Sequence, residues 1–110
     1  MGQLHEINAE NFKSDVLKAD KPVLLEFGAV WCNPCKVLEP IMEELAGEWG
    51  DDVLVAKIDV DHHAEIAGSY QVLSVPTTIL FKHGEPLERF VGLQTKQRLD
   101  EKVQAHLQAA

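Results

Sequence analysis

The sequence predicts an α/β domain with a central β-sheet covered by helices on both faces. One observation is that strand-like and helical segments alternate along the whole chain. Another is that the segments beginning at Val23 and Val53 are nearly continuous apolar runs, which is typical of parallel strands buried on both faces. The chain has 110 residues, of which 45% are hydrophobic and 25% charged, so we expect a single domain over residues 1–110.

Five strands are expected. They cover residues 3–7, 23–27, 53–59, 77–82 and about 87–91. Pro22 opens the second strand, since proline is accepted where a strand begins. His83 and Gly84 form a predicted two-residue turn, which requires the last two strands to be antiparallel. The order of the strands within the sheet does not follow from the sequence.

Four helices are expected between and after these strands. They cover about residues 8–18, 33–49, 62–69 and 95–107. Asn8 and Thr95 have side chains suited to cap the first and the last of them. Pro40 falls inside the second helix and is expected to kink it, because proline lacks the N–H donor and clashes with the preceding turn. The aromatic residues expected in the core are Phe12, Phe27, Trp49, Phe81 and Phe90.

The composition disfavours several classes of function. The formal net charge is -8, and no basic cluster is present, so we expect no nucleic-acid partner. No apolar run approaches the ~18 residues of a membrane-spanning helix, and we expect no membrane partner. Residues 1–10 lack the pattern of a signal peptide, which favours a cytoplasmic location. We also expect the chain to be a monomer.

The chemistry is indicated by the only two cysteines, Cys32 and Cys35, which are separated by two residues at a strand-to-helix junction. The motif around them reads Trp31-Cys32-Asn33-Pro34-Cys35-Lys36. A Cys-x-x-Cys in this setting is a thiol–disulfide redox signature. Lowering a thiol pKa by one to two units requires roughly 1.4 to 2.7 kcal/mol, and a helix N-terminus supplies up to about 2 kcal/mol. Cys32 is therefore the expected nucleophile, and Cys35, one turn further in, is the expected resolving thiol.

This motif and the order of the segments resemble the thioredoxin family along nearly the whole chain. The resemblance implies the thioredoxin fold, a mixed five-stranded sheet flanked by four helices. It also implies an enzyme that reduces disulfides in other proteins through a reversible Cys32–Cys35 disulfide, with no further cofactor. The implied electron donor is a flavin-containing thioredoxin reductase that draws on NADPH.

The sequence departs from the family pattern at three positions near the motif. Asn33-Pro34 stands where the family usually has Gly-Pro, although Pro34 still suits the first helical turn. Gly28 replaces an aromatic residue, which is expected to loosen the loop before Trp31, and Ser74 replaces a common glycine. We expect Asn33 to alter the redox potential and the fit of substrates, and Ser74 to alter the substrate groove.

Glu26 is an acid within a strand expected to be buried on both faces. In the family the matching position is an aspartate under the second cysteine, accompanied by a lysine that Lys57 matches. We therefore expect burial to raise the pKa of Glu26 and Glu26 to act as the base for Cys35, and as the acid in the reverse direction. The glutamate side chain is one methylene longer than that of aspartate, so its carboxyl group is expected to reach Cys35 directly. The alternative is a purely structural ion pair between Glu26 and Lys57.

The substrate face is implied by Val75-Pro76-Thr77, which matches the family's loop with a cis proline; an ordinary trans turn is the alternative. The Val75 main chain is expected to pair with an extended substrate segment. An apolar patch is expected to form around Cys32, and Val91 is expected to belong to it. The residues expected to bind substrate are Trp31, Asn33, Pro34, Val75, Pro76, Gly92 and Leu93.

Other interpretations of the cysteine pair remain open. A structural disulfide is the alternative for a secreted protein. A zinc site requires about four ligands, which His62 and His63 would complete. The pair is also compatible with a disulfide oxidase or isomerase. A further alternative is a thioredoxin-fold binding or holdase module in which the cysteines have no role.

Overall fold

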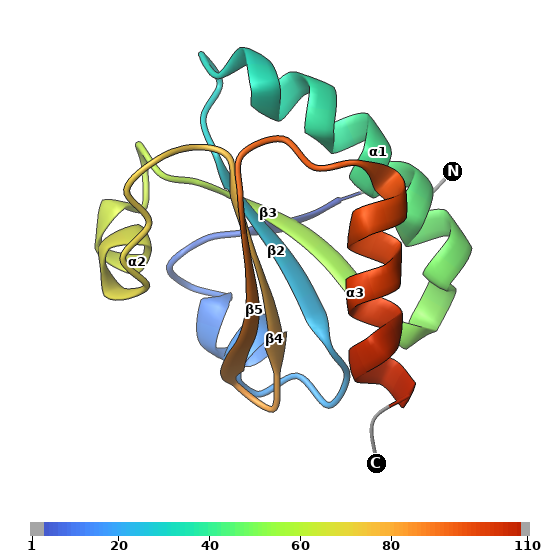
Figure 1. Cartoon of the computed structure of the whole chain (residues 1–110). Helices are drawn as coiled ribbons and strands as arrows, with labels where there is room; N and C mark the ends of the chain where they lie inside the picture. The colour runs from blue at the N-terminus through green and yellow to red at the C-terminus, as the bar shows by residue number, and fades with distance from the viewer. Residues whose placement is uncertain (1–3, 109–110) are drawn as a thin grey trace.

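A computed structural model describes residues 4–108 and confirms a mixed five-stranded sheet of the order β1-β3-β2-β4-β5 (Figure 1). The strands are β1 (His5–Ile7), β2 (Val23–Gly28), β3 (Leu54–Asp59), β4 (Thr77–Lys82) and β5 (Glu85–Val91). β2 is central: it is parallel to β3 and antiparallel to β4. β1 is parallel to β3, and β5 is antiparallel to β4. Residue 3, which was expected in the first strand, lies outside the described residues.

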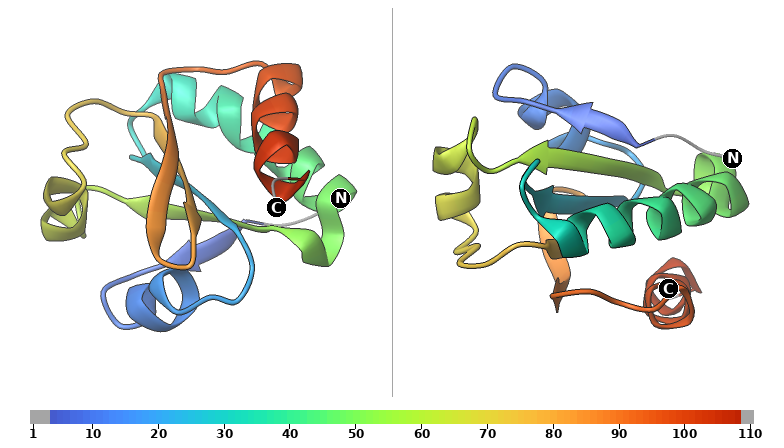
Figure 2. Two further views of the ribbon diagram at one scale, coloured as in Figure 1. Left: turned by 60° about the horizontal axis from the view of Figure 1, so that its bottom comes forward. Right: turned by 90° about the horizontal axis from the view of Figure 1, so that it is seen from above.

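Helices cover both faces of the sheet, as predicted (Figure 2). α1 and α3 pack on one face, and the π-helical turn η1 and α2 pack on the other. A short 3₁₀ turn, η2, stands where only a turn was expected. The bounds are η1 (Lys13–Leu17), α1 (Asn33–Trp49), η2 (Gly50–Asp52), α2 (Ala64–Ser69) and α3 (Lys96–Gln108). No helix of the described residues is both long enough and apolar enough to cross a membrane.

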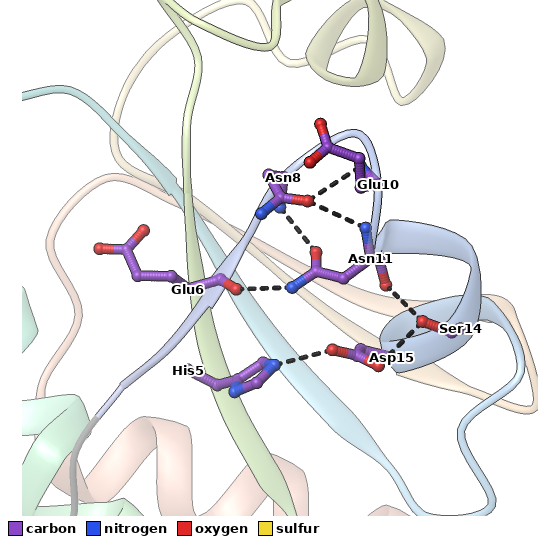
Figure 3. A network of polar contacts seen from close by, with 7 residues as sticks. All are labelled: His5, Glu6, Asn8, Glu10, Asn11, Ser14 and Asp15. Atoms are coloured by element: carbon purple, nitrogen blue, oxygen red, sulfur yellow. Dashed lines mark hydrogen bonds and ion pairs between the residues drawn. The ribbon is translucent and has the colours of Figure 1, made fainter.

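The first regular helical turn begins at Lys13, later than predicted, and Asn8 caps the turn ahead of it, as predicted (Figure 3). The Asn8 side-chain oxygen accepts hydrogen bonds from the main-chain N–H groups of Glu10 and Asn11, each at 2.9 Å. The Asn11 side chain accepts from the Asn8 N–H at 2.7 Å and donates to the Glu6 carbonyl oxygen at 2.9 Å. These bonds are a reciprocal N-terminal cap, and the Phe12 N–H donates to the Asn8 carbonyl oxygen at 3.0 Å, so helical bonding starts ahead of Lys13.

The hairpin and the last helix follow the predicted local chemistry. His83 and Gly84 both have positive φ, 53° and 79°, as a two-residue hairpin turn requires. β5 therefore starts directly after the turn, two residues earlier than expected. The Thr95 hydroxyl oxygen accepts a hydrogen bond from the Arg98 N–H at 3.1 Å, which confirms Thr95 as the cap of α3.

Alternation along β2 places the functional side chains between the sheet and α1. Val23, Leu25 and Phe27 pack in the core under η1 and α2, whereas Leu24 packs in the core under α1 and α3. Glu26 therefore faces α1 with Leu24, because successive strand residues point to opposite faces. α1 continues through Pro40 without a break. All five predicted core aromatic residues are buried.

Candidate active site

The two cysteines lie where β2 gives way to α1, and they are joined as a disulfide with their Cα atoms 5.3 Å apart. Cys32 is the N-cap of α1, and its Sγ accepts a hydrogen bond from the Cys35 N–H at 3.2 Å. Cys32 is 3% exposed and Cys35 0%, which confirms that the second cysteine is the more buried one.

The electrostatics at this helix end favour a thiolate. The Sγ of Cys32 faces the unpaired N–H groups and the positive end of the α1 dipole. The first turn of α1 contains no acidic residue to oppose that field. Pro34 lies in this turn, where its missing N–H costs nothing. These features stabilise negative charge on Cys32 in the reduced form.

Glu26 is completely buried, and neither of its carboxyl oxygens has a hydrogen-bond donor. Its position relative to Cys35 follows from Gly28. A Cβ atom at Gly28 would lie 3.0 Å from Glu26 Oε2 and 3.2 Å from Cys35 Sγ. The carboxyl group and the sulfur thus border one small space, which a larger residue at position 28 would fill.

Burial, and next to it the nearby carboxylate of Glu39 on α1, raise the pKa of Glu26 to about 8. Lys57 on β3 acts in the opposite direction. Because Glu26 and Glu39 are both acceptors when ionised, a hydrogen bond between them forms only when one of them carries a proton. The site therefore favours a proton on Glu26 near neutral pH.

Lys57 lies opposite Glu26 in the parallel pairing of β2 and β3. Its Nζ forms ion pairs with Glu39 Oε1 at 3.4 Å and with Glu6 Oε1 at 3.6 Å. Within residues 4–108, no ion pair joins Lys57 to Glu26. Partial burial alone would lower the pKa of Lys57, but Glu39 and Glu6 outweigh it and raise the pKa. Lys57 is therefore a charged neighbour of Glu26 whose ion pairs are made with other acids.

The Val75–Pro76 peptide bond is cis, as the resemblance implied. Val75 packs against Cys32, Cys35 and Ala29. Among the described residues, no hydrogen bond engages the Val75 main chain. Pro76 itself is buried, so its ring is not part of the exposed patch that was expected. The loop thus leaves one unpaired stretch of main chain beside the disulfide.

The sequence model of the thioredoxin family matches residues 3–105. The chain belongs to the thioredoxin family. It is 50% identical over 95 residues to a thioredoxin of Mycolicibacterium smegmatis, covering 84% of this chain and 85% of the relative. It is 48% identical over 94 residues to a thioredoxin of Mycobacterium bovis, covering 86% of this chain and 81% of the relative. A bifunctional thioredoxin reductase/thioredoxin of Mycobacterium leprae is 47% identical over 94 residues, which are 86% of this chain and 20% of that protein.

As a thioredoxin-family protein with its cysteine pair bonded at the start of α1, the chain is a thiol–disulfide oxidoreductase. Trp31, Val91 and Leu93, which were predicted to lie in an apolar surface patch, have exposed side chains. The sequence interpretation missed Val30 and Leu73, which are also exposed, Leu73 at 95%. An isolated leucine in a loop carries no periodicity that would have revealed it.

Two polar residues of the site were also missed. The Trp31 Nε1–H donates to Asp61 Oδ2 at 2.8 Å, so Asp61 fixes the indole of the residue that precedes Cys32. Glu39 contacts Lys57 and neighbours Glu26. It lies four residues after Cys35 on α1, and that spacing is the signal that could have placed both residues on one helix face.

The two histidines suggested as ligands for a metal site have other neighbours. His62 Nδ1 is 3.0 Å from Asp59 Oδ2, and His63 precedes α2. Residues 4–108 contain no group of three or more His, Cys, Asp or Glu side chains arranged to hold a metal ion. The structure thus does not bring His62 and His63 together with the two cysteines as one ligand set.

Proposed function

We propose that Cys32 is the nucleophile and Cys35 the resolving thiol in the reduction of disulfides in other proteins. The observation that carries this proposal is the placement of Cys32 Sγ at the N-terminus of α1, bonded to a fully buried Cys35. The Cys32 thiolate attacks one substrate sulfur, a mixed disulfide forms, and the other substrate sulfur leaves as a thiolate that takes a proton from solvent. Cys35 then attacks Cys32, which releases the second substrate sulfur and closes the Cys32–Cys35 disulfide.

In this scheme Glu26 accepts the proton of Cys35 before Cys35 attacks. The support is that the Glu26 carboxyl and Cys35 Sγ border the same space at Gly28. A base with a pKa near the working pH suits proton transfer, and the pKa of Glu26 is raised to about 8 mainly by burial. Lys57 tunes that pKa downward by its charge.

We infer that substrates bind as extended segments beside the disulfide. The unpaired Val75 main chain would hold such a segment by strand-like hydrogen bonds. Trp31, Pro34 and Leu93 would supply apolar contacts from the surrounding loops. Asn33 would lie beside the attacked sulfur, and Gly92, with φ of 85°, would allow close approach of the peptide main chain. Pro76 would act from below the surface by shaping the loop.

The oxidised protein requires an electron donor to begin another cycle. We propose a flavin-containing thioredoxin reductase that uses NADPH, with no cofactor held by this chain. The similarity to a bifunctional thioredoxin reductase/thioredoxin supports this partner. A reducing compartment such as the cytoplasm is the corresponding location, because the pair must be reduced again after each turnover.

The first test is reduction of insulin with dithiothreitol as the electron source. The purified protein is expected to accelerate precipitation of the reduced insulin chains, whereas a holdase or binding module would not. Alkylation with iodoacetamide provides a second readout on the dithiol form. Cys32 is expected to react faster at pH 7 than a free peptide cysteine, because the helix N-terminus stabilises its thiolate. Equal reactivity would contradict the proposed role of Cys32.

Asn33 gives a specific reason to test an oxidase or isomerase as the second candidate. An amide beside Cys32 can donate a hydrogen bond to the thiolate and so stabilise the dithiol form, which makes the couple more oxidising. We expect Asn33→Gly to make the potential more negative by roughly 10 to 30 mV, which corresponds to one hydrogen bond in a two-electron couple. A redox titration against glutathione measures both proteins.

The wild-type potential also separates the two candidates. The thioredoxin couple lies at about −270 mV and that of a strong disulfide oxidase at about −120 mV. A value near the first supports the reductase, and a value near the second favours the oxidase. A potential that is the same in both proteins would show that Asn33 does not tune the couple.

A further inference from the structure

A cleft on the α1 side of the sheet ends at the buried Glu26. Its volume is about 320 Å³. Glu26 lies on its buried side without exposed surface, and Gly28 contributes no side chain to fill it. The ionisable residues that line it come from α1 (Lys36 and Glu39), β1 (Glu6) and β3 (Lys57 and Asp59). A buried acid with no donor thus faces a cleft that opens among charged side chains.

The cleft matters because Glu26 must exchange its proton with solvent in every cycle. If Glu26 takes the proton of Cys35, it has to lose that proton before the next turnover. Glu26 is 0% exposed and cannot pass the proton to bulk water directly. Glu39 is its acidic neighbour, and the Glu39 side chain is 28% exposed. Glu39 therefore lines the same cleft as the buried acid and also reaches the solvent.

The neighbouring charges hold Glu39 in this position. Lys57 Nζ lies 3.4 Å from Glu39 Oε1 and stands opposite Glu26 on the adjacent strand. Glu39 also lies one helical turn after Cys35, so both side chains point from α1 toward the sheet. Glu26 thus lies between Cys35 on one side and the cleft on the other. Glu39 and Lys57 line that cleft.

We propose that Glu39 is a positioning residue of the disulfide exchange, which shares the proton of Glu26 and passes it to the solvent in the cleft. The Cys35 S–H bond breaks and its proton forms an O–H bond on Glu26. The sulfur electron pair forms the bond to Cys32, while the bond between Cys32 and the substrate sulfur breaks and that sulfur leaves as a thiolate that solvent protonates. Glu26 then donates to the Glu39 carboxylate, and that proton leaves to water. The proposal rests on the role of Glu26 proposed above, and it assigns Glu39 as the exit.

The test is the Glu39→Gln variant, which keeps the size of the side chain but cannot carry the proton. A ¹³C-carboxyl NMR titration of Glu26 is compared with the pH profile of insulin reduction. Because Glu39 raises the pKa of Glu26, the Glu26 midpoint is expected to fall by about one pH unit or more in the variant. The rise of the reduction rate with pH is expected to shift in the same direction, since Glu26 acts as a base when ionised.

Glu6→Gln is the matched control. Glu6 also pairs with Lys57, at 3.6 Å, and its loss removes the same charge from the same cleft. Figure 3 shows the Glu6 carboxylate directed away from the Asn8–Asn11 turn, to which only its main-chain oxygen bonds. This variant is expected to leave the Glu26 midpoint and the pH profile unchanged.

The outcomes distinguish the two proposals. Shifts in both readouts with Glu39→Gln alone, together with a maximal reduction rate below that of the wild type, support the role of Glu39. An unshifted Glu26 midpoint, a maximal rate equal to that of the wild type, or equal shifts in both variants would each overturn it. Failure of the wild-type protein to reduce insulin would instead overturn the proposed function.

Discussion

Replacing Cys35 with serine is expected to stop turnover after a single chemical step. Cys32 would still attack a substrate disulfide, because its position at the start of α1 does not depend on the second sulfur. The mixed disulfide would then persist, since no thiol one helical turn away can expel the substrate. Insulin reduction is expected to fall by at least about 10³-fold, given the effective molarity of a well-placed intramolecular group.

Non-reducing mass spectrometry measures the trapped species. After incubation with oxidised insulin, Cys35→Ser is expected to carry one insulin chain per molecule, released by dithiothreitol. Cys32→Ser is the matched control, because it removes the other half of the same disulfide and is expected to carry none. If Cys32→Ser formed the adduct and Cys35→Ser did not, the roles of nucleophile and resolving thiol would have to be exchanged.

The parts of the site that depend on local sequence could be predicted. The cysteine spacing, the strand before it and the helix after it lie within one short segment, and the structure confirms the placement of Cys32 at the helix start. Burial of Glu26 also followed from its place in an apolar strand. These features depend on residues that are neighbours along the chain, and their geometry is set by periodicity and capping.

Features that depend on how elements pack could not be derived in the same way. Glu39 and Glu26 are neighbours only because α1 lies across β2 with one particular face turned to the sheet. The Gly28 prediction concerned a loosened loop, whereas the structure shows that Gly28 leaves room for the longer acid beside Cys35. Asn8 was predicted as a helix cap from its own side chain, whereas the reciprocal bond from the Asn8 N–H to the Asn11 side chain was not predicted.

Glu26→Gln is expected to change the pH dependence of stability more than any other single substitution considered. The pKa of Glu26 is about 8 in the folded protein against an ordinary value of 4.5, so the folded state binds more protons between these values. Stability must therefore fall as the pH rises through this range. Above pH 8, the full shift lowers the free energy of unfolding by about 5 kcal/mol, since one pKa unit is about 1.4 kcal/mol.

The glutamine variant has no charge to bury, so its stability lacks this decline. The difference in unfolding free energy between variant and wild type is expected to grow in favour of the variant from pH 5 to pH 9, by roughly 3 to 5 kcal/mol. Guanidinium unfolding of the oxidised proteins at several pH values measures it. Glu10→Gln, which removes an exposed carboxylate, is expected to show no such trend.

The same variant separates the stability role of Glu26 from its chemical role. Glutamine cannot accept the Cys35 proton, so insulin reduction by Glu26→Gln is expected to lose the part of its pH profile that Glu26 controls. If the stability difference grows with pH while the turnover profile stays that of the wild type, Glu26 is a buried acid without a part in proton transfer. If both change, the unfavourable burial of this carboxyl is explained by its task beside Cys35, because an apolar residue would be more stable there and could not take the proton.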